Sequence, residues 1–241
     1  EKARVLEAAG YDMSLDSPDW ASIQYQNANN SVRVTDAFME AAAENREFNL
    51  TARTDGSVVS TVDARGLLRE IAAAAWECAD PGVQYDTTIN AWHTLPNTGR
   101  IHASNPCSED MSIDDSACNL ASLNLMKFRR EDGELDVEAF EHACDVVFLA
   151  QEILVGNSSY PTPEIERNAK AYRQLGLGYA NLGALLMARG LAYDSDEGRA
   201  YAAAITALMT GRAYRESSVI AGRMGPFAGY RPNAAAMLGV I

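Results

Sequence analysis

The chain has 241 residues, of which 47% are hydrophobic and 22% charged, values typical of a globular protein with a sizeable core. No apolar run reaches the ~20 residues that cross a bilayer, and no secretory signal opens the chain. The formal charge of −13 disfavours binding to a nucleic-acid polymer, whose phosphates need clustered lysine and arginine. We therefore expect neither a membrane nor a nucleic-acid polymer as partner.

The first element that the pattern predicts is a helix over Glu1–Gly10. The sequence begins at Glu1 without a Met and ends at Ile241 without a polar tail, which indicates a piece of a longer protein. A strand is expected at Ser31–Val34 and a helix from Asp36, with its apolar side chains on one face.

A hairpin is predicted next, over Phe48–Ser60, because Thr and Val alternate there around an Asp55-Gly56 turn. Asp63 has the character of an N-cap, and the helix that it starts should run to about Cys78. Pro81-Gly82 ends this helical stretch.

Residues 83–124 are rich in Asn, Thr, Ser, Asp and Pro and contain few helix-forming runs. Apolar residues such as Trp92 and Ile101 are embedded in this stretch and argue against disorder. We interpret it as a long loop that carries chemistry on a rigid scaffold.

Helices dominate the second half of the predicted structure. The expected helices are Val137–Val155, the Gly- and Ala-rich Leu175–Ala188, and Arg199–Arg223. Pro161-Thr162-Pro163 starts a new unit after the first of them, and Gly225-Pro226 ends the last. There is no internal repeat, so the whole is interpreted as one α/β unit.

The four cysteines are too few for a disulfide scaffold, and none forms a CxxC or a zinc-type cluster with histidine. We expect a cytoplasmic protein with reduced thiols and no metal site. Cys144 lies at core spacing on a helix and is assigned to packing, and Cys78, at a helix end, is assigned a structural role.

The chemistry is expected in Ser104-Asn105-Pro106-Cys107-Ser108-Glu109. Pro106 disfavours helix at Asn105, so the segment is predicted to be extended, with Asn105, Cys107 and Glu109 on one face. A neighbouring carboxylate makes a thiol a poor thiolate nucleophile. A hydrogen-atom role needs no thiolate, and the carboxylate can act as a base toward a substrate hydroxyl.

A second thiol, Cys118, follows eleven residues after Cys107, in the segment CNLASLNL. A thiol this close in sequence could supply reducing equivalents by becoming half of a disulfide.

NPCSE followed by CNLASLNL resembles the active-site loop of ribonucleotide reductase large chains. The resemblance implies that Cys107 becomes a thiyl radical and abstracts the ribose 3′-hydrogen, that Glu109 accepts the 3′-hydroxyl proton, and that Asn105 holds the sugar. It matches Cys118 to the family's downstream redox cysteine. Residues 104–109 together are the implied substrate-binding segment.

Three further stretches, QNANNSVRVTDAFM, AWECADPGVQYDTTINAWHT and YRQLGLGYANLGALL, resemble the same family, so the likeness covers most of the chain. The short spacing between Cys107 and Cys118 and the sequence NPCSE resemble class II, which uses adenosylcobalamin (vitamin B12). Leu95, His102 and Asp110 depart from the sequence usual in that class, but none of them replaces a catalytic group.

The fold implied by the resemblance is part of the ten-stranded α/β barrel of ribonucleotide reductases, with a finger loop at about 100–125 and a helical part at about 136–224. The implied partners are a ribonucleotide substrate, a nucleotide effector, a thioredoxin-type reductant and the missing segments of the same enzyme. By itself the chain is expected to be inactive, because the other redox cysteines and the phosphate-binding loop are not in it.

Alternatives stay open. The chain could come from a class I large subunit, or be a non-catalytic piece that only assembles with the rest of a split enzyme. A cysteine hydrolase would need a histidine base near Cys107, and His102 is the local candidate.

Overall fold

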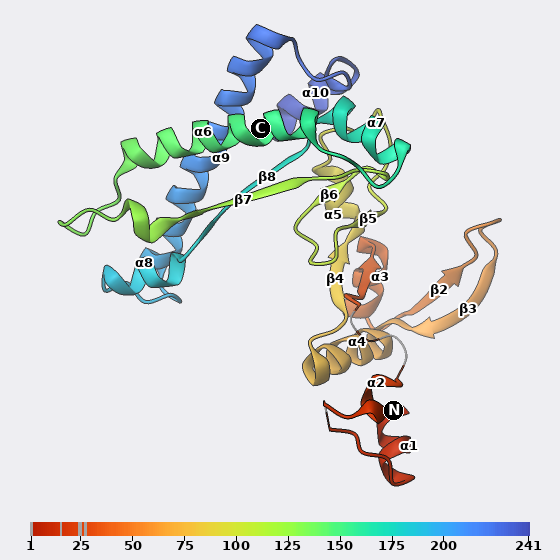
Figure 1. The fold of residues 1–241 in the computed structure, drawn as a ribbon. Helices are drawn as coiled ribbons and strands as arrows, with labels where there is room; N and C mark the ends of the chain where they lie inside the picture. The colour runs from red at the N-terminus through yellow and green to blue at the C-terminus, as the bar shows by residue number, and fades with distance from the viewer. Residues whose placement is uncertain (1, 15, 24–25, 27) are drawn as a thin grey trace. The chain divides into compact units, whose positions relative to one another are not determined.

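The computed structural model describes residues 2–14, 16–23, 26 and 28–241 (Figure 1). These residues divide into two compact units. Unit 1 comprises residues up to Ile89 together with Ser104–Glu109, and unit 2 comprises Asn90–Ala103 and Asp110–Ile241. Each unit has its own hydrophobic cluster.

Unit 1 contains short helices, a hairpin and a parallel strand pair. Its elements are α1 (Lys2–Ala8), α2 (Pro18–Ala21), β1 (Ser31–Val34), α3 (Asp36–Ala43), β2 (Glu47–Thr51), β3 (Val58–Asp63), α4 (Ala64–Cys78) and β4 (Gly82–Tyr85). β1 and β4 are parallel, and β2 and β3 are antiparallel. The edge-to-face pair of Phe38 and Phe48, 5.2 Å between ring centroids, links α3 to the hairpin.

The sequence signals of unit 1 are confirmed where they rest on local chemistry. The strand at Ser31–Val34 and the helix from Asp36 form with the predicted bounds. The hairpin turns around Asp55-Gly56, and the Asp63 carboxylate accepts the Arg65 backbone N–H as the N-cap of α4. Helix α1 is confirmed for Lys2–Ala8, whereas Glu1 lies outside the described residues.

Helix α5 (Asp86–Ala91) and strand β5 (Ala103–Ser104) each have residues in both units. The remaining elements belong to unit 2: β6 (Met111–Ser112), β7 (Asn119–Asn124), the 3-10 helix η1 (Leu125–Phe128), α6 (Val137–Asn157), α7 (Pro163–Tyr172), β8 (Leu175–Ala180), α8 (Leu182–Ala188), α9 (Asp196–Met224) and α10 (Tyr230–Val240).

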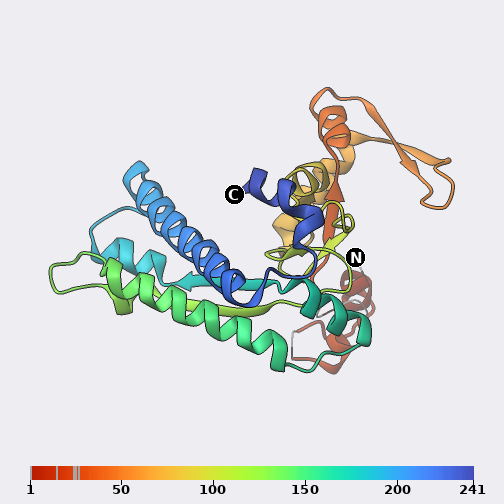
Figure 2. The ribbon, with the colours of Figure 1, turned by 90° about the horizontal axis from the view of Figure 1, so that it is seen from above.

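In unit 2, α6 packs against α9 and against the parallel strands β7 and β8 (Figure 2). Buried side chains between these elements include Leu123, Phe140, Cys144 and Met209. The predicted helices at 137–155 and 199–223 are confirmed as α6 and α9, and Gly225 caps the end of α9.

Two expectations for the second half are wrong. Residues 175–180, expected in a helix, form strand β8, because they pair along their whole length with β7. The stretch 83–124, expected as a loop, contains most of strand β4, helix α5 and the strands β5, β6 and β7. The described strands are paired two by two, so a closed ten-stranded barrel stays a prediction.

Candidate functional site

The segment that carries Cys107 is a tight turn. The backbone N–H of Ser108 donates to the carbonyl of Asn105 at 3.1 Å, with Pro106 and Cys107 at the two central positions. Ser108 has a φ of 68°, in the left-handed region. The predicted extended conformation is therefore wrong here. Proline favours the second position of a turn as readily as an extended chain, and the hydrogen bond closes the turn.

The turn changes how the three predicted side chains are presented, because side chains alternate between faces only along an extended chain. Cys107 and Glu109 are exposed, and Asn105 is half-buried. Cys107 is a free thiol whose sulfur accepts a hydrogen bond from Asn29 Nδ2 at 3.5 Å. The sulfur therefore lies at the surface of unit 1 beside an amide donor.

The turn is fastened to the β1–β4 strand pair by hydrogen bonds between side chains. Gln84, a buried residue of β4, donates from Nε2 to Ser104 Oγ at 2.7 Å and to Ser108 Oγ at 2.8 Å. The Ser31 hydroxyl of β1 lies 3.5 Å from the Ser108 hydroxyl. Two strands and a buried amide thus form the frame on which Cys107 stands.

A largely buried ion pair contacts the oxygen of the Gln84 amide. Arg33, opposite Gln84 in the strand register, donates to Gln84 Oε1 at 2.7 Å. The same guanidinium contacts Asp86 Oδ1 at 3.3 Å, and both side chains are largely buried. Such a pair has to be well hydrogen-bonded to offset its desolvation, and it fixes the position of Gln84.

Sequence reasoning did not find Gln84, and it left Asn29 and Arg33 without a role. Asn29 and Cys107 are 78 residues apart, and no local pattern signals such a contact.

Cys118 belongs to unit 2, at the entrance to β7, so its predicted pairing with the chemistry of Cys107 stays a prediction. The thiol is half-buried and contacts the Asn119 carbonyl at 3.5 Å. Strand β8 approaches it closely, since a Cβ on Gly176 would lie 3.1 Å from Cys118 Sγ. The buried Gln151 amide joins the Asn119 and Gly176 carbonyls at 3.1 and 2.9 Å and ties both strands to α6.

The other two cysteines differ from each other. Cys144 is buried in the core of unit 2, which confirms its assignment to packing. Burial raises the pKa of the Cys144 thiol to about 11, and the nearby Asp145 carboxylate adds to this rise. Cys78 is exposed near the end of α4, where its thiol contacts the Ala74 carbonyl at 3.3 Å.

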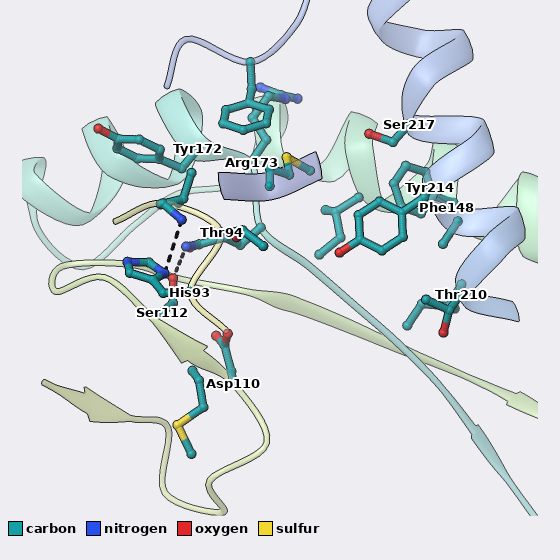
Figure 3. A pocket seen from close by; sticks show the side chains of 18 of the residues that line it. His93, Thr94, Asp110, Ser112, Phe148, Tyr172, Arg173, Thr210, Tyr214 and Ser217 are labelled. Carbon is teal, nitrogen blue, oxygen red and sulfur yellow. Dashed lines mark hydrogen bonds between the residues drawn. The ribbon is translucent and has the colours of Figure 1, made fainter. Parts of the chain in front are cut away.

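Unit 2 also contains a pocket of about 410 Å³ that the sequence analysis missed (Figure 3). His93, Asp110 and Arg173 are among its lining residues, whereas the predicted site residues are not. Burial lowers the pKa of His93, so its ring favours the neutral form. The Arg173 guanidinium is occupied by Glu152, 2.5 Å away. The pocket therefore offers no free cation from Arg173.

Two searches of the described residues found nothing. No three His, Cys, Asp or Glu side chains in the described part of the chain are grouped so that they could hold a metal ion. Within the same residues, no helix has both the length and the apolar character needed to cross a bilayer.

The described residues form an α/β architecture that presents an exposed thiol on a hydrogen-bonded turn, within the sequence pattern Asn-x-Cys-x-Glu. Residues 19–240 match the family described as ribonucleotide reductase, barrel domain, and the chain belongs to this family.

The relatives that it matches carry more specific names. The chain is 56% identical over 238 residues to a vitamin B12-dependent ribonucleotide reductase of Streptomyces coelicolor, covering 97% of this chain and 25% of the relative. It is 51% identical over 243 residues to one of Rhodopirellula baltica, covering 100% and 23%. A vitamin B12-dependent ribonucleoside-diphosphate reductase of Mycobacterium tuberculosis is 34% identical over 211 residues, covering 88% and 30%. The chain thus spans about a quarter of the length of the first curated relatives.

Proposed function

We propose that this chain carries the thiyl-radical centre of a vitamin B12-dependent ribonucleotide reductase, which makes 2′-deoxyribonucleotides for DNA synthesis. One observation carries the proposal: an exposed thiol, Cys107, stands on a hydrogen-bonded turn between Asn105 and Glu109. Family membership and the names of the relatives support the same chemistry.

The proposed reaction begins when the Cys107 thiol loses its hydrogen atom. The sulfur radical takes the 3′-hydrogen of the ribose, and Glu109 accepts the proton of the 3′-hydroxyl. Asn105 hydrogen-bonds to the sugar, and the 2′-hydroxyl leaves as water with a proton from the redox thiols. Cys118 and a second thiol outside this chain supply two electrons and two protons in all, of which one proton leaves in the water and one hydrogen goes to the 2′ carbon, and they become a disulfide, while Glu109 returns its proton to the 3′ oxygen. Cys107 finally returns the hydrogen atom to the 3′ carbon, so the net change is one C–OH reduced and one dithiol oxidised.

When bound, adenosylcobalamin would supply the organic radical that starts this sequence. The residues of this chain fit such a cofactor. A radical that forms on a cofactor, and not on a protein side chain, can pass only to a thiol that is accessible to the cofactor. Cys107 is exposed, and its neighbour Asn29 donates a hydrogen bond to the sulfur at 3.5 Å. In this proposal Cys107 would receive the radical that the cofactor supplies, and the Asn29 amide keeps the sulfur in place.

We propose residues 1–241 as part of a single catalytic domain, the ten-stranded barrel, with the finger loop at about 100–125 and the helical part at about 136–224. The partners are a ribonucleotide, a nucleotide effector, a thioredoxin-type reductant and the remaining segments of the enzyme, in the cytoplasm. The substrate-binding segment is Ser104–Glu109, which includes Ser104, Pro106 and Ser108 beside the three catalytic side chains.

The alternatives have less support. A class I large subunit does not agree with relatives that are named vitamin B12-dependent. A cysteine hydrolase would need an imidazole at the thiol, but the Cys107 sulfur accepts from the Asn29 amide, and His102 pairs with Asp114 at 2.9 Å.

The test uses the complete reductase polypeptide with Cys107→Ser, and with Cys78→Ser as the matched exposed cysteine. We expect Cys107→Ser to reduce deoxyribonucleotide formation to background without unfolding the protein, because a hydroxyl does not yield its hydrogen atom as a thiol does. Cys78→Ser should keep activity within about twofold, as expected for an exposed substitution away from the site. Product formed by Cys107→Ser at the normal rate would refute the proposal.

A further inference from the structure

We propose that Gln84 is a positioning residue, whose buried amide holds both sides of the Cys107 turn and so fixes the direction of the thiol. The inference rests on the proposed radical role of Cys107. It assigns a task to a side chain that neither the motif nor the family match singles out.

The hydrogen bonds show how one amide group can hold a whole turn. Gln84 Nε2 has two N–H groups, and it donates to Ser104 Oγ at 2.7 Å and to Ser108 Oγ at 2.8 Å. These two serines stand before and after the Asn105–Cys107 segment. The Ser104 hydroxyl also donates to the Asn105 carbonyl at 2.7 Å, the same carbonyl that closes the turn. We call Gln84, Ser104 and Ser108 the amide clamp.

The orientation of the Gln84 amide is fixed from behind. Arg33 donates at 2.7 Å to Gln84 Oε1, and a guanidinium has donors only. The amide oxygen must therefore face Arg33, and the NH₂ group must face the two hydroxyls. The largely buried pair of Arg33 and Asp86 keeps the guanidinium in place. A flipped amide would leave two donors facing each other on the Arg33 side.

The turn has a physical need for such a clamp. Ser108 holds a left-handed φ of 68°, which is unfavourable for a residue other than glycine. Cys107 itself is exposed, so no core packing around its side chain holds it. A small displacement of a reacting group can lower a rate by about 10²-fold, so precise placement of the sulfur is what a reductase needs here.

The experiment compares Gln84→Met with wild type in the complete reductase. Methionine keeps the length of the side chain but cannot donate to the serines. We expect kcat to fall by about 10- to 100-fold, and by a larger factor than KM rises, because the reacting thiol loses its alignment within a segment that also binds the substrate. The control is Asn233→Leu, which removes another buried amide, one that bonds Asn97, Thr98 and Gly229 in unit 2. This variant should lose stability but keep kcat.

A double-mutant cycle tests whether Gln84 acts through the two hydroxyls. The half-buried pair Ser104→Ala/Ser108→Ala removes the hydrogen bonds to Gln84, together with the contacts of the two hydroxyls with the Asn105 carbonyl and Ser31, so it tests the clamp even if Gln84→Met folds poorly. We expect this double variant to lose at least as much kcat as Gln84→Met, and the addition of Gln84→Met to lower kcat no further. Independent, multiplying effects would overturn the clamp, as would a normal kcat in Gln84→Met.

Failure of the clamp and failure of the proposed function give different results. If Cys107→Ser is inactive but both clamp variants turn over normally, the radical role stands and the clamp is wrong. If Cys107→Ser makes product, the radical role itself is wrong, whatever the clamp variants do.

Discussion

Two cysteines of this chain, Cys107 and Cys144, take opposite properties from their surroundings. Cys107 is exposed on a polar turn, whereas Cys144 is fully buried between α6 and its neighbours. Burial and the adjacent Asp145 raise the pKa of the Cys144 thiol to about 11, above the ordinary 9.0. Because only the thiolate is an effective nucleophile, Cys144 should be chemically silent in the folded protein.

We therefore expect iodoacetamide at pH 9 to label the exposed Cys78 of the folded protein and to leave the buried Cys144 unlabelled. The thiolate fraction of Cys144 rises only as the pH approaches about 11, so any native labelling should increase steeply toward that pH. Peptide mass spectrometry measures both sites in one sample. In guanidinium chloride the two cysteines should label alike, and equal labelling in the folded protein would contradict the prediction.

At the residue scale, the sequence pointed to Cys107, whose reactivity stays a prediction, but not to the groups that hold it. Cys107 could be found because Pro106 and Glu109 flank it in a short, specific motif. Gln84 and Asn29 could not, because they reach the turn from 24 and 78 residues away. The conformation of the turn was also missed, since proline is compatible with both an extended segment and a turn.

At the scale of elements, local capping chemistry predicted most boundaries. The hairpin at Asp55-Gly56 and the N-cap at Asp63 depend on neighbouring residues alone. Strand β8 was mistaken for a helix because its Gly- and Ala-rich composition suits close packing of either kind. What makes residues 175–180 a strand is their register with 119–124, which no local signal encodes.

Two glycines of helix α9 should respond oppositely to alanine. A Cβ on Gly198 would lie 2.4 Å from the Ala192 carbonyl oxygen, a backbone atom that cannot move cheaply, while a Cβ on Gly211 would meet nothing within 4 Å. We expect Gly198→Ala to lower the free energy of unfolding by about 1–3 kcal/mol. Gly211→Ala should raise it by about 0.5–1 kcal/mol, since alanine favours helix.

Urea unfolding of the two variants beside wild type measures both effects. The comparison within one helix cancels any general property of α9. A stabilised Gly198→Ala would show that the start of α9 can shift away from Ala192 more easily than the contact implies.

At the scale of the whole molecule, the strand pairs bear on the proposed ten-stranded barrel. Within the described residues, β1 pairs only with β4 and β7 only with β8, both in parallel. Parallel strands normally lie inside larger sheets that are covered on both faces, and pairs of strands alone have little stability. The relatives are about four times as long as this chain, which leaves ample polypeptide to supply further strands.

We expect hydrogen–deuterium exchange to reveal these missing neighbours. In the complete reductase, peptides covering 119–124 and 175–180 should be strongly protected, because further strands would pair with their open edges. In the isolated chain the same peptides should exchange markedly faster. Peptides from α9 should change little, since their amides bond within the helix itself. Equal protection of β7 and β8 in both samples would mean that the pair needs no further strand. The physical argument for a ten-stranded barrel in this chain would then no longer hold.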